Sequence, residues 1–362
     1  MNQEWSENNK RMQSLIGREK TFAEGIDVLI DLRNDLFSQI AYIANTYPEE
    51  AFYQMPFAGA SGYHSKTLAY SMWHIFRIED IVAHTLISGD EQVFFAGDWQ
   101  KKTRSPIITT GNECKGEEIA EFSKKLDVNA VFEYCKAVKE STDVLLQGLA
   151  YTDLKRRFSE EDKNRVKDSR CVSTDEEALW LVDYWCEKDI RGLIKMPFSR
   201  HWIMHIEAMC RIKNKLCQMA RKGADPVARC GLSCNHCFLK EWCGGCRTAY
   251  NTCSDAMNHP GKVCPNTACC MEKQIDGCYE CDAMESCRKG FYAYDDVNAI
   301  KAMAVFIRKY GKKDLLKSLD RLHSQHDFEK IQEVLGNDLA EALQILEQTR
   351  TSDTNQARNK TI

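Results

Sequence analysis

Cysteines crowd one short stretch of this chain. Twelve of the eighteen cysteines fall between Cys230 and Cys287, in a sequence of 362 residues. Their spacing is C-x3-C-x2-C-x5-C-x2-C-x6-C, then C-x4-C-C, then C-x2-C-x5-C. A stretch this rich in thiols folds around either disulfide bonds or metal ions, and the redox state of the compartment decides between them.

The N-terminal sequence indicates a reducing compartment. MNQEWSENNKRMQSLIGREK carries charges throughout and has neither an apolar core nor a small-residue cleavage site, so it lacks the pattern of a secretory signal. No window reaches the roughly 18 consecutive apolar residues of a membrane span. We therefore expect a cytoplasmic protein with no membrane-spanning segment, in which the cysteines bind metal.

Short C-x2-C pairs let two thiolates hold one ion from a tight turn. The twelve thiols suffice for two or three tetrahedral four-cysteine zinc sites, which would supply folding free energy to a small domain. Zinc is the expected metal, and an iron–sulfur cluster is the alternative because cysteine-only ligation suits it equally. Cys270 is left out because it adjoins Cys269, and two adjacent thiolates fit one ion poorly. The expected ligands are Cys230, Cys234, Cys237, Cys243, Cys246, Cys253, Cys264, Cys269, Cys278, Cys281 and Cys287.

The first three of these cysteines also have the C-x3-C-x2-C spacing with which radical S-adenosylmethionine enzymes bind a cluster. Those enzymes place the motif after the first strand of an α/β barrel. The residues after Cys237 contain few strand-like runs, so we set this interpretation aside.

Length and composition indicate two domains in a mainly α protein. The chain exceeds the usual ~100 to 200 residues per domain, and its 43% hydrophobic content can build a core. The net charge of -4, without a dense basic run, argues against a nucleic-acid partner. We expect a helical bundle over residues 1–225, a cysteine-rich metal-binding domain with further helices over 226–350, and a disordered tail over 351–362.

Four long amphipathic helices are expected in the first domain. Asp127 is placed to cap the third of them, and Pro48 and Gly89 end the first two. The apolar stripes of four such helices predict a four-helix bundle. Helical periodicity is found over residues 22–43, 68–82, 127–149 and 198–222.

The connection between the third and fourth of these helices, over about residues 152–197, is long for a bundle, which ordinarily joins helices in ~2 to 8 residues. It could cover or replace part of a site. It is expected to include a shorter helix over 178–194.

Three histidines lie on the apolar faces of these helices. His201 and His205 stand at i and i+4 in RHWIMHIEAMCRIK, so they project from one face. His74, in SMWHIFRIED, lies on the apolar stripe of the second helix. Three neutral imidazoles leave one open coordination position, as in catalytic zinc sites. Taken alone, such histidines are more often packed core residues.

One histidine in the second long helix and H-x-x-x-H in the fourth resemble the DinB-like superfamily of four-helix bundles, over residues 18–222. The resemblance implies a divalent metal, zinc or nickel, at His74, His201 and His205. Because the superfamily includes thiol S-transferases, it also implies a metal-dependent transferase or hydrolase in detoxification or stress response. Such an enzyme would act on a low-molecular-weight thiol or another small molecule.

The sequence RCGLSCNHCFLKEWCGGCR resembles a family of small cysteine-rich domains of unknown function. That family opens with CGLxCxxC, followed by CxGC and a later CxxC, here Cys278 and Cys281. The resemblance covers residues 228–320 and implies no activity.

Two non-enzymatic functions remain open from the sequence. In one, the protein is a redox or metal sensor whose cysteine domain reports and whose bundle binds a ligand. In the other, it is an interaction protein with structural zinc sites. Apolar stripes over residues 295–348 predict two or three more helices, which either join the core or form a homodimer face.

Overall fold

The computed structural model describes the backbone of residues 2–358 and the side chains of residues 2–350. The described chain is mainly α-helical and contains no β-strand, which confirms the expected fold class. It divides into two compact units, Met1–Lys213 and Asn214–Ile362. No helix in the described part is both long and apolar enough to cross a membrane.

The division falls within α11 (His201–Lys222), earlier than the boundary at 225 expected from the sequence. The last turns of this helix are bound within the second unit. Gln218 donates to Glu241 at 2.7 Å, and Arg221 donates to the carbonyl of Lys240. Because α11 continues without a break across the division, no turn or linker in the sequence marks the boundary there.

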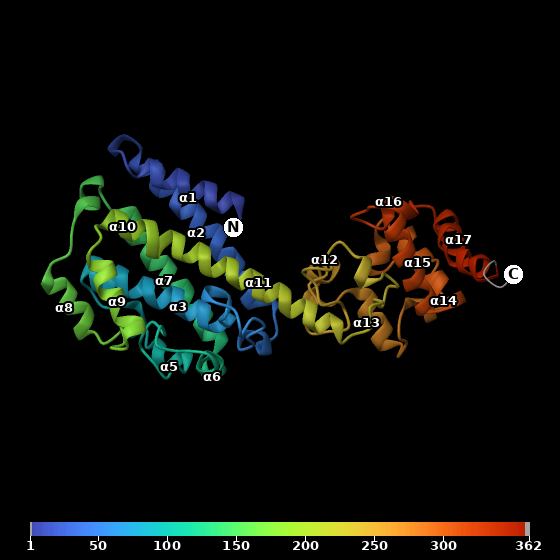
Figure 1. Ribbon diagram of the computed structural model, residues 1–362, viewed down its shortest axis with the longest axis horizontal. Helices are drawn as coiled ribbons and strands as arrows, with labels where there is room; N and C mark the ends of the chain where they lie inside the picture. Colours follow the sequence, from blue (N-terminus) through green and yellow to red (C-terminus); the bar gives the residue numbers. More distant parts are fainter. Residues whose placement is uncertain (1, 359–362) are drawn as a thin grey trace. The chain divides into compact units, whose positions relative to one another are not determined.

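The first unit consists of helices joined by loops and short 3-10 turns (Figure 1). Two π-helical segments, Ile81–Ser88 and Met196–Arg200, extend α3 and precede α11. Short 3-10 turns lie at Glu19–Thr21, Glu49–Phe52, Gly62–His64 and Tyr151–Lys155. The α-helices are α1 (Gln3–Leu15), α2 (Phe22–Thr46), α3 (Leu68–Asp80), α4 (Val93–Ala96), α5 (Trp99–Thr103), α6 (Glu117–Lys125), α7 (Val128–Gly148), α8 (Glu160–Asp168), α9 (Glu176–Cys186), α10 (Ile190–Lys195) and the first part of α11.

The four helices expected to form the bundle are α2, α3, α7 and α11. Asp127 caps α7 as predicted, since its Oδ1 accepts a hydrogen bond from the amide of Ala130 at 3.1 Å. The helical run that begins with α3 ends at Gly89, whose φ of 73° is the left-handed conformation that glycine adopts readily. Local sequence signals therefore locate the ends of these helices.

One buried polar network joins side chains from all four helices. Arg33 of α2, which has no exposed surface, donates to both oxygens of Glu79 of α3 at 2.8 and 2.9 Å. Its Nε donates to Asp143 of α7 at 2.6 Å. The indole of Trp202 in α11 donates to Glu79 at 2.7 Å. The network fixes how these helices are rotated against one another.

The connection over residues 152–197 is helical and packs into the core of the first unit. The single helix expected over 178–194 is two helices, α9 and α10, because Asp189 accepts a hydrogen bond from the amide of Gly192 and starts α10. Side chains from the connection share one buried cluster with residues of α2 and α3: Leu154, Val166, Leu181, Trp185, Leu29 and Ile78.

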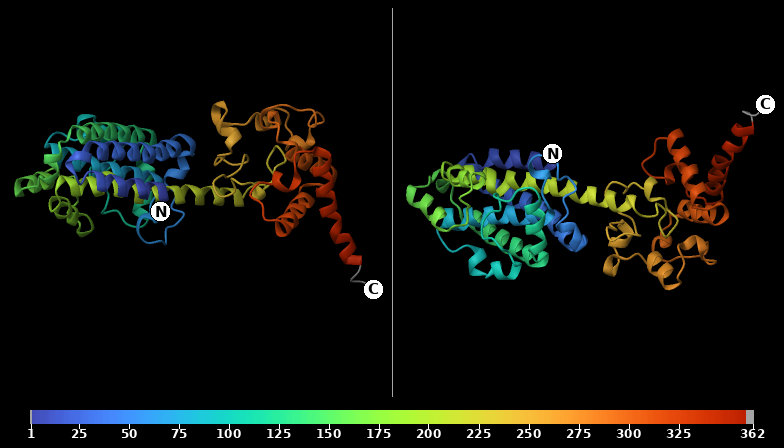
Figure 2. Two further views of the ribbon diagram at one scale, coloured as in Figure 1. Left: turned by 90° about the horizontal axis from the view of Figure 1, so that it is seen from above. Right: turned by 60° about the horizontal axis from the view of Figure 1, so that its bottom comes forward.

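The second unit combines cysteine-rich loops with helices near the C-terminus (Figure 2). Short 3-10 turns lie at Cys234–His236, Pro260–Lys262, Cys278–Glu280 and Gly290–Ala293. The tail predicted to be disordered from 351 is helical to Arg358, and residues 359–362 lie outside the described part. The helices are α12 (Ser254–Met257), α13 (Pro265–Glu272), α14 (Asn298–Tyr310), α15 (Lys312–Gln325), α16 (Gln332–Leu335) and α17 (Leu339–Arg358).

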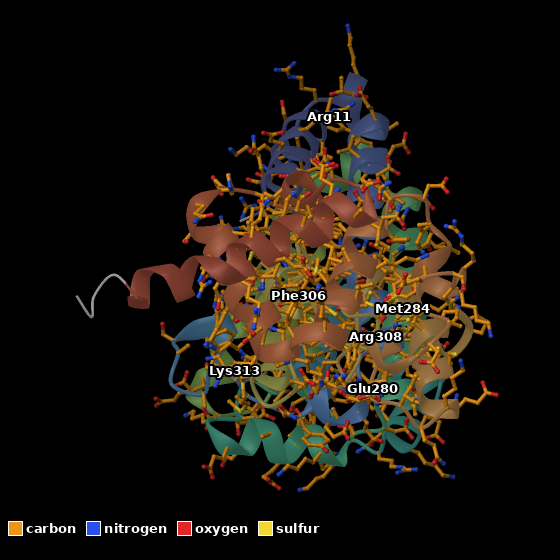
Figure 3. All side chains as sticks on the ribbon, turned by 90° about the vertical axis from the view of Figure 1, so that its right-hand side faces the viewer. Arg11, Glu280, Met284, Phe306, Arg308 and Lys313 are labelled. Atoms are coloured by element: carbon orange, nitrogen blue, oxygen red, sulfur yellow. The ribbon has the colours of Figure 1, made fainter. Side chains whose placement is uncertain are left out.

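Helices α14, α15 and α17 pack against one another, and the cysteine-rich loops contact them. Phe306, which is fully buried on α14, lies in a cluster with Leu319 of α15 and Leu346 of α17 (Figure 3). Arg308 of α14 donates to the carbonyl of Tyr279 at 3.0 Å, which ties the loop around Cys278 to the helices. The apolar stripes over 295–348 therefore form a core.

Replacing Arg33 by alanine should destabilise the first unit by about 3 to 5 kcal/mol, because it leaves the buried carboxylate of Glu79 without its cation. Urea unfolding followed by tryptophan fluorescence measures this, since six of the seven tryptophans lie in the first unit. The matched control is Arg11→Ala, which breaks an ion pair with Glu24 whose partners are 60% and 53% exposed. It should cost less than about 1 kcal/mol. Equal losses for the two variants would contradict a central role for the network.

Candidate metal centre

Three histidine side chains meet inside the first unit. His74 comes from α3, and His201 and His205 come from the first two turns of α11. Their ligand nitrogens lie within 4.8 Å of one another, the only such set among the histidine, cysteine, aspartate and glutamate side chains of the described residues. The H-x-x-x-H spacing and the position of His74 on an apolar helix face thus predicted that these three side chains lie close together.

The distance between two of the rings matches a metal site. His74 Nε2 and His201 Nε2 are 3.3 Å apart. Two nitrogens bound to one tetrahedral zinc ion at about 2.05 Å would stand about 3.3 to 3.4 Å apart. The side chains therefore have the separation that shared ligation requires.

The tautomer of His74 is set by the backbone. Its Nδ1 lies 2.9 Å from the carbonyl oxygen of Thr110, and because a carbonyl only accepts, Nδ1 carries the proton. The lone pair of Nε2 then faces the other two imidazoles. Metal-binding histidines commonly have their second nitrogen held in this way.

The other two rings contain buried nitrogens with no hydrogen-bond partner. These are Nδ1 of His201 and both Nδ1 and Nε2 of His205. An unsatisfied buried polar group costs about 1 to 3 kcal/mol. Coordination of a metal ion would offset part of this cost, which gives the cluster a physical reason to bind one.

Burial keeps the three rings neutral. It lowers the pKa of His74 to about 4, helped by the charge of Lys66 and opposed by the hydrogen bond to Thr110. Burial also holds the pKa values of His201 and His205 well below the ordinary histidine value. The neutral imidazole is the form that binds metal, so the site is ready to do so at neutral pH.

The cluster opens on a cavity of about 210 Å³. His74 and His201 lie on its wall, and much of the remaining wall comes from α9 and the turn before α11. The connection over residues 152–197 therefore borders the site, as its length suggested. The other lining residues are Tyr63, Ile78, Asn112, Trp180, Leu181, Tyr184, Trp185, Met196 and Pro197.

Aromatic rings also contact the histidines directly. Tyr70 stacks on His74 with ring centres 5.5 Å apart, and the rings of Tyr63 and His205 meet edge to face with their centres 4.7 Å apart. Sequence reasoning missed these tyrosines and the tryptophans of the cavity. The run WLVDYW, residues 180–185, was the one available signal, since aromatic residues this dense commonly line binding sites.

The nearby carboxylates have other partners. Glu79 is bound by Arg33 and Trp202. Glu207 accepts a hydrogen bond from the backbone amide of Asn2. Consistent with the sequence reasoning, we assign neither of them as a general base.

The twelve cysteines between Cys230 and Cys287 line two separate cavities, of about 70 Å³ and about 250 Å³. No disulfide bond joins any of the eighteen cysteines, all of which lie in the described part of the chain. The second cavity includes Cys270, which the sequence prediction left out and whose sulfur lies 3.8 Å from that of Cys278. The first cavity is lined by Cys230, Cys234, Cys237, Cys243, Cys246, Cys253 and Cys264, and the second by Cys269, Cys270, Cys278, Cys281 and Cys287.

Replacing His205 by alanine should remove about one equivalent of divalent metal from the protein, because only two imidazoles then remain. Elemental analysis after dialysis against zinc or nickel measures the change. The matched control is His84→Ala. His84 is also buried, but Asp90 and Ser141 hydrogen bond to its two ring nitrogens, so its loss should leave the metal content unchanged. Equal metal content in wild type and His205→Ala would show that the three histidines are packed core residues that bind no metal.

Comparisons of this chain with protein-family models, with curated proteins and with solved structures found no match. The interpretation of the histidine cluster therefore rests on its own geometry.

Proposed function

We propose that this protein is a metal-dependent enzyme that activates a thiol or a water molecule for attack on a small electrophilic substrate. The reaction would resemble that of the thiol S-transferases in the DinB-like superfamily. The single observation that carries the proposal is the convergence of His74, His201 and His205, with unpartnered buried nitrogens, beside an open cavity.

The number of histidines favours catalysis over a structural role. Structural zinc sites take four protein ligands, whereas catalytic sites take three and keep one position for water or substrate. The cluster supplies three, and the cavity beside it gives a small molecule room to reach the fourth position. A divalent ion held there would supply Lewis acidity, which lowers the pKa of a thiol or water ligand.

The residues around the cluster would bind and orient the substrate. Trp180, Tyr184 and Trp185 present apolar surface that suits an aromatic or aliphatic electrophile and excludes water. Asn112 contributes an amide side chain to the wall, and its Oδ1 accepts a hydrogen bond from the hydroxyl of Thr110. Because the backbone of Thr110 also holds His74, this loop would position both metal ligand and substrate.

Turnover should depend on the cluster and on the aromatic wall in different ways. With zinc or nickel bound, a panel of low-molecular-weight thiols and small electrophiles should yield a thioether product for at least one pair. His205→Ala should lower kcat/KM by about 100-fold or more, since the Lewis acid is lost. Trp180→Ala should mainly raise KM, since it removes substrate contact without touching the ligands.

The control for the wall is Leu179→Ala, which alters the neighbouring exposed side chain of α9 that does not line the cavity. It should leave kcat and KM unchanged. Stoichiometric metal at the histidines, combined with no thiol transfer and no hydrolysis of activated esters, would contradict the enzymatic proposal and favour a sensor or interaction role.

A further inference from the structure

We infer that Cys270 and Cys278 form a redox-active dithiol, which is oxidised to a disulfide by exchange with a small anionic disulfide bound in the second cavity. This inference does not depend on the histidine site. It rests on the separation of the two sulfurs, the ligand atoms around them, the access that the cavity gives and the charges on its wall.

The sulfurs of Cys270 and Cys278 are hydrogen-bonded neighbours. They stand 3.8 Å apart, and a disulfide bond is about 2.05 Å long, so forming the bond requires an approach of less than about 2 Å. Backbone hydrogen bonds hold both residues: the amide of Ile275 donates to the carbonyl of Cys270 at 3.0 Å, and the amide of Cys278 donates to the carbonyl of Arg229 at 2.6 Å. The two thiols are therefore already placed for reaction with each other.

The surroundings of this pair differ from those of a metal site. A structural zinc site takes four protein ligands. Among the described residues, no third sulfur, imidazole nitrogen or carboxylate oxygen lies within 4.8 Å of both sulfurs. The geometry therefore favours thiol–disulfide exchange, which needs two thiols, over metal binding, which needs more ligands.

The second cavity gives a small molecule access to both thiols. Cys270 is 1% exposed and Cys278 is 8% exposed, but both line this cavity of about 250 Å³. A disulfide on the surface of another folded protein could not reach sulfurs that are buried to this extent. The exchange partner is therefore a small molecule that enters the cavity.

The wall of the second cavity is positively charged. Lys273, Arg288 and Lys289 line it, whereas no aspartate or glutamate of the described residues does. In the described part of the chain, none of these three cations makes an ion pair with a carboxylate. Lys273 instead donates to the sulfur of Cys281 at 3.3 Å. Such surroundings stabilise thiolates and attract anions, so the cavity suits a disulfide that carries carboxylates.

The exchange consists of two displacements. One thiolate of the pair attacks a sulfur of the bound disulfide, forms a mixed disulfide and releases the first small thiolate. The second protein thiolate then attacks the protein sulfur of that mixed disulfide, which forms the Cys270–Cys278 bond and releases the second small thiolate. The two protons lost by the cysteines pass to the released thiolates. The protein loses two electrons, and the small disulfide is reduced to two thiols.

The test is to react the full chain with one equivalent of dithiodipropionate, a disulfide with two carboxylates, and to map the bonded cysteines by mass spectrometry after alkylation. We expect a Cys270–Cys278 bond in most chains before any other pair of cysteines is joined. The uncharged bis(hydroxyethyl) disulfide should form this bond about 10-fold more slowly at low salt, because the cations do not attract it. Salt at about 1 M should remove most of that difference by screening.

Two kinds of variant separate the thiols from the charges. Cys270→Ser and Cys278→Ser should each stop the reaction no later than the mixed disulfide. The matched control is Cys269→Ser, which removes another thiol of the same cavity but keeps the pair, and it should react like wild type. Lys289→Gln should slow the reaction with dithiodipropionate and leave that with bis(hydroxyethyl) disulfide unchanged.

A first bond between any other two cysteines of the wild-type protein would overturn the inference, even if every variant failed to fold. Zinc or iron that keeps both thiols unreactive until a chelator removes it would also overturn it, because the thiols would then be metal ligands. Equal rates for the two disulfides at low salt would overturn the assignment of an anionic partner. An alanine variant of His74, His201 and His205 should react like wild type, so failure of the histidine site is distinguishable from failure of this one.

Discussion

The buried guanidinium of Arg33 is the interaction on which the first unit depends. It binds Glu79 and Asp143, and Glu79 in turn accepts the indole hydrogen of Trp202. Trp202 directly follows His201, and Glu79 lies on the same helix as His74. The contacts that fix the rotation of these helices about their axes therefore also direct the three imidazoles toward one another. Because well-packed apolar side chains often replace a buried ionic network without loss of stability, we attribute to this network the fixed rotation of the helices and not net stability.

The connection between α7 and α11 packs beside the histidine cluster and helps to form the cavity next to it. Helices in a compact bundle need only short links, and this one instead adds its own helices to the core. Its aromatic residues, including Trp180 and Tyr184, form part of the wall of the cavity beside the histidines. The histidine cluster lies on α3 and α11, whereas the aromatic residues of the cavity wall lie on α9, in the connection.

The sequence predicted the features that local patterns determine. Long helices with apolar stripes and the projection of His201 and His205 from one face follow from helical periodicity alone. Short helices such as α4 were missed because distant residues start them. The carboxylate of Asp80 accepts hydrogen bonds from the amides of Val93 and Phe94, thirteen or more residues away.

The grouping of the cysteines was equally beyond sequence reasoning. Motif spacing shows which thiols are adjacent on the chain, but the cavities combine residues from several motifs, as Cys253 joins the two C-x2-C pairs before it. Cys270 was set aside for its neighbour Cys269, yet both line the second cavity. Only three-dimensional packing separates these sets.

The most direct test of the central claim is a crystal structure of the full chain grown with zinc or nickel, with diffraction data collected at the absorption edge of that metal. The account predicts an anomalous peak within about 2.0 to 2.2 Å of one nitrogen from each of His74, His201 and His205. An anomalous map with no peak between these rings would contradict it.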